Sequence, residues 1–268
     1  MKTLANMDEI MYHTGLSRQM IHGATIAVIP GDPARVPILA KALDEKAYFL
    51  ATSRDYTSYL SFVDDTPILL MSTGMGGPCV TFAVEELARL GIDTFLRVGT
   101  TGAIQENISP GTVIINYASV RNDGASRAYA PVNYPAVATP SIVRALEESA
   151  AALHISYTLG ISISTDSFWP GQERYDSFGG YVLNRLKNTL SEYRALGCTN
   201  YEMENATLFT LTSVLGLKSG SICGVVAKRT DSESIVPKEI YKQAETAFCQ
   251  IVAYAVKHFL LPKSKWNN

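Results

Sequence analysis

The chain has 268 residues, of which 47% are hydrophobic and 18% are charged, and its composition is that of an ordinary globular protein. That length can bury a sizeable core as one large domain or two small ones. A formal net charge of -2 and a pI near 6.1 give no overall electrostatic reason to bind nucleic acid or an anionic membrane surface, so any bound anion must be met by local groups.

The first residues, 1–13, include Asp8 and Glu9 and lack the apolar stretch of a secretory signal. Nowhere does an apolar run approach the roughly 20 residues that a membrane-spanning helix needs. We therefore expect a cytoplasmic protein that binds no membrane. The four cysteines are widely scattered and form no metal-spaced cluster with histidines, which favours buried reduced thiols over disulfides or zinc.

Short apolar runs rich in β-branched residues predict buried strands at 24–30, 67–72, 94–98, 112–117, 155–163 and 221–226. Helical patterns follow at 78–90, 140–153, 202–215 and 238–260. Strands that alternate with helices predict an α/β fold with a largely buried mixed sheet. Because no repeat or charged linker divides the chain, we expect one domain over 1–268.

The strand predicted at 24–30 ends in a Gly-Asp-Pro turn that delivers Arg35 just beyond the strand terminus. Ligands of α/β proteins bind at such termini, and Gly31 lets the backbone approach an anion closely. The same residues also suit an ordinary turn with a solvated arginine. A second glycine-rich segment, 72–78, opens a helix, where it either attracts an anion or allows close packing.

A third segment, 95–103, places Arg97 inside an apolar strand and follows it with two hydroxyl residues in a glycine-flanked turn. An unpaired buried guanidinium would cost several kcal/mol, so Arg97 must meet either a carboxylate or a bound anion. The segment by itself leaves both alternatives open.

Five segments together resemble the nucleoside phosphorylase superfamily: GDPARV, STGMGGP, ELARLGIDTFLRVGTTGAIQ, FWPGQERYD and NYEMENATLFTL. They occur in the family's order from about residue 13 to the last helix, and GQERYD is the most specific for the uridine-cleaving branch. The resemblance implies a nucleoside phosphorylase fold, in which helices flank a central mixed, barrel-like sheet. It also implies reversible phosphorolysis of uridine, with deoxyuridine and thymidine as further candidates, to uracil and ribose 1-phosphate in pyrimidine salvage.

For phosphate, the resemblance implies a site built from Gly31, Arg35, Arg97 and Thr100, completed by Arg54 from a neighbouring subunit. Guanidinium groups match phosphate oxygens in pairs, and backbone N–H and hydroxyl groups can complete such a site. Phosphate would be a co-substrate, and the resemblance implies no organic cofactor.

For the nucleoside, the resemblance implies two further groups of residues. The ribose-binding residues are His13, Thr100, Met203 and Glu204. The base-binding residues are Thr101, Gly102, Phe168, Gln172, Arg174, Tyr201, Glu202, Val226 and Arg229. Uracil needs an amide that donates and accepts and a cation that only donates, which Gln172 and Arg174 would supply. His13 would reach the 5′-hydroxyl from a neighbouring subunit. Without the resemblance, the nucleoside-binding residues would read as ordinary residues of loops and helix starts.

The residues expected to carry catalysis are Arg97, Gln172, Arg174 and Glu204. Phosphate would attack the anomeric carbon while Glu204 orients the sugar, and Arg174 with Gln172 would stabilise negative charge on the departing uracil. The polar loop at 230–237 is expected to close over the base and exclude water. Arg229 stands where purine-cleaving relatives carry a catalytic aspartate, which favours a pyrimidine substrate.

The sequence leaves two alternatives: a purine phosphorylase or nucleosidase of the same superfamily, and a nonenzymatic nucleoside-binding protein. The second would leave the expected phosphate residues without a use. The resemblance further implies a hexamer built from dimers, and potassium between subunits near Asp55, Met75 and Cys79. Asp55 replaces a usual glutamate and Cys79 a usual serine, which weakens the potassium expectation. Lys228 and Trp169 also depart from the family pattern and could shift substrate range.

Overall fold

Ten strands form one mixed sheet in the computed structural model, which describes residues 3–261. In chain order the strands are β1 (Ile26–Pro30), β2 (Tyr48–Ser53), β3 (Tyr56–Val63), β4 (Thr66–Met71), β5 (Thr94–Ala103), β6 (Val113–Asn122), β7 (Ala136–Val137), β8 (Tyr157–Thr165), β9 (Asn200–Glu202) and β10 (Lys218–Lys228). The α-helices are α1 (Val36–Leu43), α2 (Gly77–Leu90), α3 (Pro140–Ala152), α4 (Thr189–Ala195), α5 (Asn205–Val214) and α6 (Lys238–Ala255).

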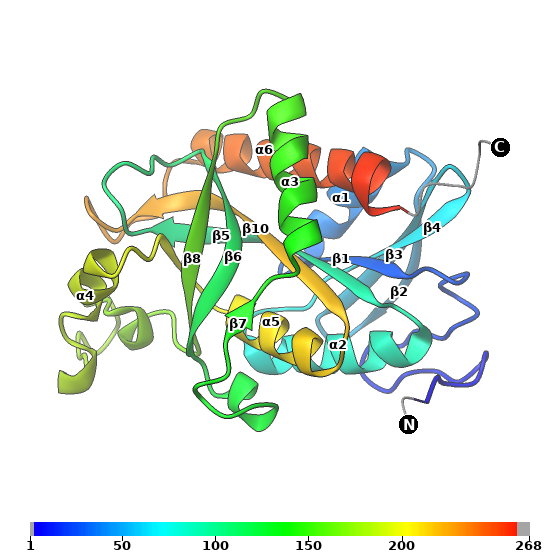
Figure 1. The fold of residues 1–268 in the computed structure, drawn as a ribbon, viewed down its shortest axis with the longest axis horizontal. Helices are drawn as coiled ribbons and strands as arrows, with labels where there is room; N and C mark the ends of the chain where they lie inside the picture. The colour runs from blue at the N-terminus through cyan, green and yellow to red at the C-terminus, as the bar shows by residue number, and fades with distance from the viewer. Residues whose placement is uncertain (1–2, 262–268) are drawn as a thin grey trace.

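Five of the strands close into a ring. They follow the order β10, β6, β8, β9 and β5, and β10 pairs with β5 as well as with β6. From β5 the sheet continues outward through β1, β4, β3 and β2. This closed mixed sheet with flanking helices confirms the expected barrel-like α/β fold (Figure 1).

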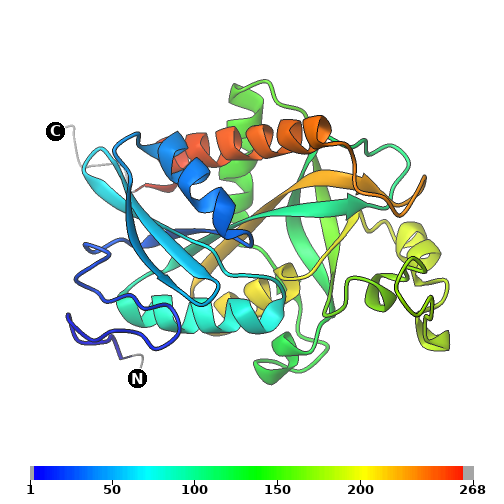
Figure 2. The same cartoon turned by 180° about the vertical axis from the view of Figure 1, so that it is seen from behind.

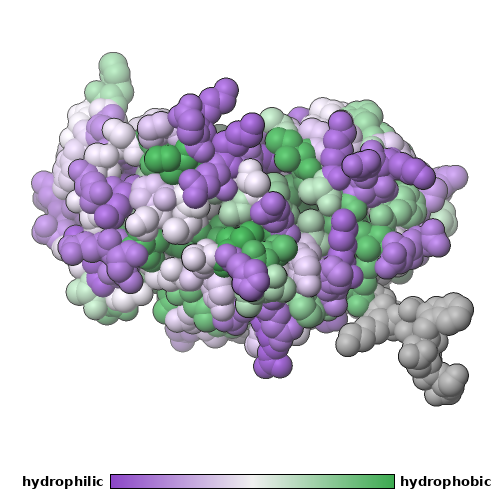
Figure 3. All heavy atoms as spheres, turned by 90° about the horizontal axis from the view of Figure 1, so that it is seen from above, coloured by the Kyte–Doolittle hydropathy of each residue, from purple (hydrophilic) through white to green (hydrophobic). Residues whose placement is uncertain are grey.

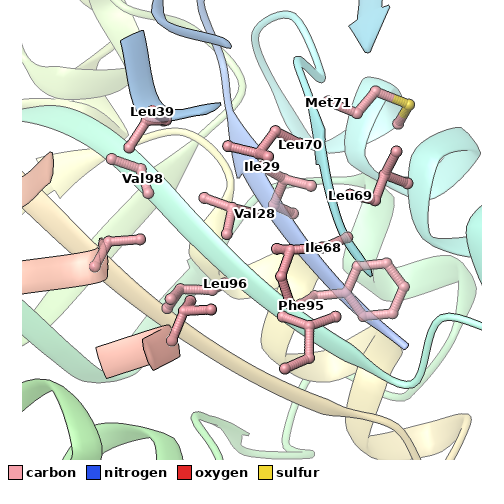
Figure 4. Packing of buried hydrophobic residues seen from close by; sticks show 14 of the residues in the cluster. Val28, Ile29, Leu39, Ile68, Leu69, Leu70, Met71, Phe95, Leu96 and Val98 are labelled. Carbon is pink, nitrogen blue, oxygen red and sulfur yellow. The ribbon is translucent and has the colours of Figure 1, made fainter. Parts of the chain in front are cut away.

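Helices cover the sheet on opposite sides. In Figures 1 and 2, α1 and α6 lie on one side and α2 and α5 on the other, while α4 projects from one end of the molecule. One part of the hydrophobic core lies between α1 and the strands β1, β4 and β5, where Val28, Leu39, Leu70 and Leu96 lie close together (Figure 4). These side chains are almost completely buried, so the hydrophobic effect holds the strand ends in place.

The predicted strands and long helices are present, with some differences. Strands β5 and β10 run further than expected, because they pair with each other along most of their length. One prediction was wrong: Glu202 does not begin a helix but ends β9, where it lies opposite Ser164 of β8. Helix α5 starts only at Asn205, with Glu204 as its N-cap.

The expectation of one domain over 1–268 stays a prediction, and its ends, 1–2 and 262–268, lie outside the described residues. Across residues 3–261, no helix is long and apolar enough to cross a membrane. On the face seen in Figure 3, which Figure 1 has at the top, hydrophobic side chains lie in small groups among hydrophilic ones.

Candidate active site

A cavity of about 670 Å³ opens where several strands end. Strands β1, β5 and β10 run parallel to one another, so their carboxyl ends meet at the same edge of the sheet. The cavity is lined by the residues that follow β1, by the end of β5 and by the segment between β9 and α5. Such an edge is where open α/β sheets bind ligands.

One end of the cavity carries two arginines. Four of the residues predicted for phosphate line this end: Gly31, Arg35, Arg97 and Thr100. The turn after β1 rests on the turn after β4, because the Gly74 N–H donates to the Gly31 carbonyl at 3.0 Å. The Arg35 Nε lies 3.2 Å from Glu245 Oε1, and its Nη2 donates to the Tyr241 hydroxyl, both on α6.

Arg97 lies at the floor of this end, only 7% exposed. Its Nη2 donates to Glu204 Oε2, and its Nη1 lies 3.2 Å from the Cys223 sulfur. Burial alone would lower the pKa of Arg97, but the Glu204 carboxylate raises it, so the guanidinium stays charged. Arg97 therefore has the carboxylate partner that was one of its two alternatives, and because it also lines the cavity, its contact with a bound anion stays a prediction.

Two neighbouring glutamates serve different purposes. Glu202 is fully engaged inside the protein: its Oε2 accepts the N–H groups of Glu204 and Asn205, both at 2.8 Å, and its Oε1 accepts the Ser164 hydroxyl. Burial raises the pKa of Glu202. Glu204 accepts the Gly76 N–H at 2.6 Å and lines the cavity, and the strand that it follows, β9, lies between β5 and β8 in the sheet. Glu204 is thus the carboxylate placed to meet sugar hydroxyls, and Met203 lies beside it on the cavity wall.

The other end of the cavity carries an aromatic ring, an amide and a guanidinium. Phe168, Gln172 and Arg174 follow β8, with Gln172 in a short 3-10 helix (Pro170–Gln172). The Arg174 guanidinium lies 4.2 Å from the centre of the Phe168 ring. Burial and the nearby Arg229 both lower the pKa of Arg174. The other predicted base-binding residues on the cavity lining are Thr101, Gly102, Tyr201, Glu202 and Val226.

Three predicted residues lie outside the lining. Arg229 sits behind Gln172 and donates to its carbonyl at 3.0 Å. His13, in the N-terminal segment, packs against α2, where its Nδ1 is 2.6 Å from Glu86 Oε1 and its ring stacks on Phe82. Arg54 stands over the Tyr12 ring at 5.2 Å. The structure therefore brings together the residues expected from one subunit, and leaves apart the two expected from a neighbour.

Among the residues that line the cavity or hold its arginines, the sequence did not single out Glu233, Ile235, Tyr241 and Glu245, although the first two lie in the loop at 230–237. Tyr241 and Glu245 are four residues apart on α6 and so share one helix face. That spacing could have predicted that the two side chains meet the same partner. Their partner Arg35 is more than 200 residues away in the chain, and only the folded sheet reveals that pairing.

The residues predicted for potassium, Asp55, Met75 and Cys79, lie together on the cavity lining. Burial and the nearby Asp55 raise the pKa of the Cys79 thiol, so the sulfur is a neutral, soft donor. Hard monovalent cations prefer oxygen, and in residues 3–261 no group of three or more histidines, cysteines or acids could hold a metal ion. The Cys79 sulfur is thus a poor ligand for potassium, and the cation site stays a prediction.

The chain belongs to the phosphorylase superfamily, whose family model matches residues 25–257. Among curated relatives, it is 45% identical over 250 residues to the uridine phosphorylases of Klebsiella aerogenes and of Escherichia coli strain K12. Each of these alignments covers 93% of this chain and 98% of the relative. A uridine phosphorylase of Thermococcus kodakarensis is 42% identical over 87% of this chain and 82% of the relative.

Proposed function

We propose that this protein catalyses the reversible phosphorolysis of uridine to uracil and ribose 1-phosphate, with deoxyuridine and thymidine as further candidate substrates. The observation that carries this proposal is the order of groups along one cavity. The cavity residues come from strands that are neighbours in the order β1, β5, β9 and β8: Arg35 follows β1, Arg97 lies in β5, Glu204 follows β9, and Gln172 and Arg174 follow β8. These groups match phosphate, ribose and uracil in the order in which a nucleoside and attacking phosphate would lie.

At the phosphate end, Arg35 and Arg97 would bind the dianion, with the Thr100 hydroxyl and the Gly31 backbone beside them. Phosphate would replace Glu204 as the counter-ion of Arg97. Glu204 would then accept hydrogen bonds from the ribose hydroxyls and hold the anomeric carbon next to a phosphate oxygen. This placement makes the attack effectively unimolecular.

The reaction forms a bond from a phosphate oxygen to the anomeric carbon and breaks the bond from that carbon to N1 of uracil. The electron pair of the broken bond stays with the base and spreads onto its carbonyl oxygens. Arg174 and Gln172 would donate hydrogen bonds to those oxygens, and the resulting anion is later protonated by solvent. The four proposed catalytic residues thus act on charge and position, without a covalent enzyme intermediate.

We also propose that the protein acts in the cytoplasm as an oligomer, with dimers assembled into a hexamer. His13 and Arg54 lie outside the cavity of their own chain, close to strongly exposed side chains such as Tyr12 and Met75, which are 76% and 80% exposed. A second subunit that covers this apolar surface would place its own His13 and Arg54 at the cavity rim.

The direct test is turnover of uridine by the purified protein, with and without phosphate, and with inosine as the purine control. We expect uracil and ribose 1-phosphate in equal amounts, and only when phosphate is present. Cleavage of inosine instead of uridine would contradict the assignment of the base end, and binding without cleavage would favour a nucleoside-binding protein.

A further inference from the structure

The loop that follows β10 crosses the base end of the cavity. It is held to β10 by the Val236 N–H, which donates to the Val226 carbonyl at 2.9 Å, and by a bridge between Ala227 and Ile235. Ile235 lines the cavity. The loop at 230–237 thus forms part of the base end, and a contact made by this loop can reach the bound base.

Glu233, on this loop, contacts both buried arginines of the base end. Its Oε2 is 3.1 Å from Arg174 Nη1 and 2.7 Å from Arg229 Nε, and its Oε1 accepts from Arg229 Nη2 at 3.1 Å. Its backbone carbonyl also accepts from Arg174 Nη1, at 2.7 Å. Within the described chain, Glu233 is the acidic residue that forms ion pairs with both guanidinium groups.

The two arginines need such a carboxylate. Arg174 is 2% exposed and Arg229 is 5% exposed, so two like charges lie close together out of water. The nearby Glu173 carboxylate does not serve them, because it accepts backbone N–H groups from Asn188 and Leu190. Without Glu233 the two guanidinium groups would repel each other at short range.

Glu233 also decides which part of Arg174 stays free. Both hydrogen bonds of the Arg174 side chain to the described residues use Nη1. Its Nε is buried and has no hydrogen-bond partner within residues 3–261. The N–H groups on Nε and Nη2 are parallel, and they form the edge of a guanidinium that suits two acceptor atoms or a carbonyl oxygen.

We propose that Glu233 is a positioning residue for the departing base: by neutralising Arg229 and binding Nη1 of Arg174, it turns the free edge of Arg174 toward the base. This inference rests on the proposed function, because it assigns the charge that leaves with uracil to Arg174. Glu233 does not itself touch the reacting atoms. It connects the loop to the group that stabilises the leaving base.

The test compares leaving groups. Fluorine at C5 of uracil withdraws electrons and stabilises the departing anion, so 5-fluorouridine depends less than uridine on stabilisation by Arg174. We expect Glu233→Gln to lower kcat about tenfold or more for uridine and at most about threefold for 5-fluorouridine, with an unchanged KM for phosphate. Asp231→Asn is the matched control, since Asp231 is an acidic loop residue that pairs with Lys228 instead.

The outcomes separate the two claims. An equal loss of kcat on both nucleosides would show that Glu233 only keeps the loop folded. An unchanged kcat on uridine would show that Glu233 plays no part in the reaction. Either result overturns the inference and leaves the proposed function intact. A wild-type protein that cleaves neither nucleoside with phosphate would refute the proposed function, and the inference with it.

Discussion

Arg174 has no carboxylate partner on the sheet and depends on a loop residue for its charge balance. Arg97, by contrast, is paired with Glu204 at the start of α5. The two buried guanidinium groups are therefore held differently at the two ends of one cavity. In the proposed reaction phosphate takes the place of Glu204 beside Arg97, whereas Arg174 keeps its loop partner Glu233 while the base leaves.

At the residue scale, we predict that Arg174→Lys lowers kcat for uridine by about 100-fold or more, because an ammonium group lacks the parallel N–H pair of a guanidinium. Steady-state kinetics of the purified variant would measure this. Arg185→Lys, an exposed change in the same region, is the matched control. A variant with lysine at 174 and wild-type kcat would remove Arg174 from the mechanism.

The sequence singles out some functional residues and gives no sign of others. Arg97 could be singled out because a charge in an apolar strand must be paired, and the structure shows that pairing. Glu233 gave no such signal: an acidic residue in a polar loop is ordinary, and only the folded chain places it against two buried arginines. Burial can be read from a pattern, while a contact between a loop and a distant strand end cannot.

At the element scale, Glu86 fastens the N-terminal segment to α2. It accepts the N–H groups of His13 and Thr14 at 3.0 and 2.8 Å. Burial would raise the pKa of Glu86, but these hydrogen bonds lower it below its usual 4.5. A lowered pKa means that the stabilisation is present above about pH 4.5 and is lost as the pH falls through the folded-state pKa.

We therefore predict that Glu86→Gln lowers the free energy of unfolding by about 1 kcal/mol at pH 7, with allowance for its partial exposure. The difference from wild type should shrink as the pH falls below 4.5. Urea denaturation at both pH values measures it, with the exposed Glu148→Gln as control. A difference that stays constant with pH would mean that the ionised carboxylate is not what holds the segment.

The loop at 230–237 supports another prediction at this scale. Its Ile235 covers the base end, so shortening the loop should admit water as a competing nucleophile. We expect the ratio of free ribose to ribose 1-phosphate to rise in the shortened variant, as measured by product analysis. Asp231→Asn keeps the loop length and should leave that ratio unchanged. Equal ratios in all three proteins would remove the role of the loop in excluding water.

Among the elements, long apolar strands and helices were predictable and short polar ones were not. Strand β9 has only three residues, and its Asn200 is buried because Asn116 and Thr101 satisfy its amide across the barrel. Its sequence gives no strand signal, since the partners that make it a strand lie far along the chain. The hairpin of β2 and β3 was missed for a similar reason, because serine and threonine dilute its alternating pattern.

At the scale of the whole molecule, the cavity lacks two residues that the family resemblance assigns to it. If Arg54 comes from a neighbouring subunit, then at a phosphate concentration far below the raised KM of Arg35→Ala, a mixture of Arg35→Ala and Arg54→Ala subunits should regain activity that each variant largely loses alone. With random pairing, half of the dimers are mixed and each has one intact site, so about a quarter of wild-type activity should return. Coexpression followed by a uridine assay tests this, and no recovery would place both arginines in one chain.

The most direct test of the account asks whether phosphate and base bind at opposite ends of the cavity. Arg35→Ala and Gln172→Ala would each be assayed with uridine and phosphate varied in turn. We predict that Arg35→Ala raises the KM for phosphate about tenfold or more and leaves the KM for uridine nearly unchanged, and that Gln172→Ala does the reverse. If both variants raised both values alike, the cavity would not have the two separate ends on which the proposed reaction depends.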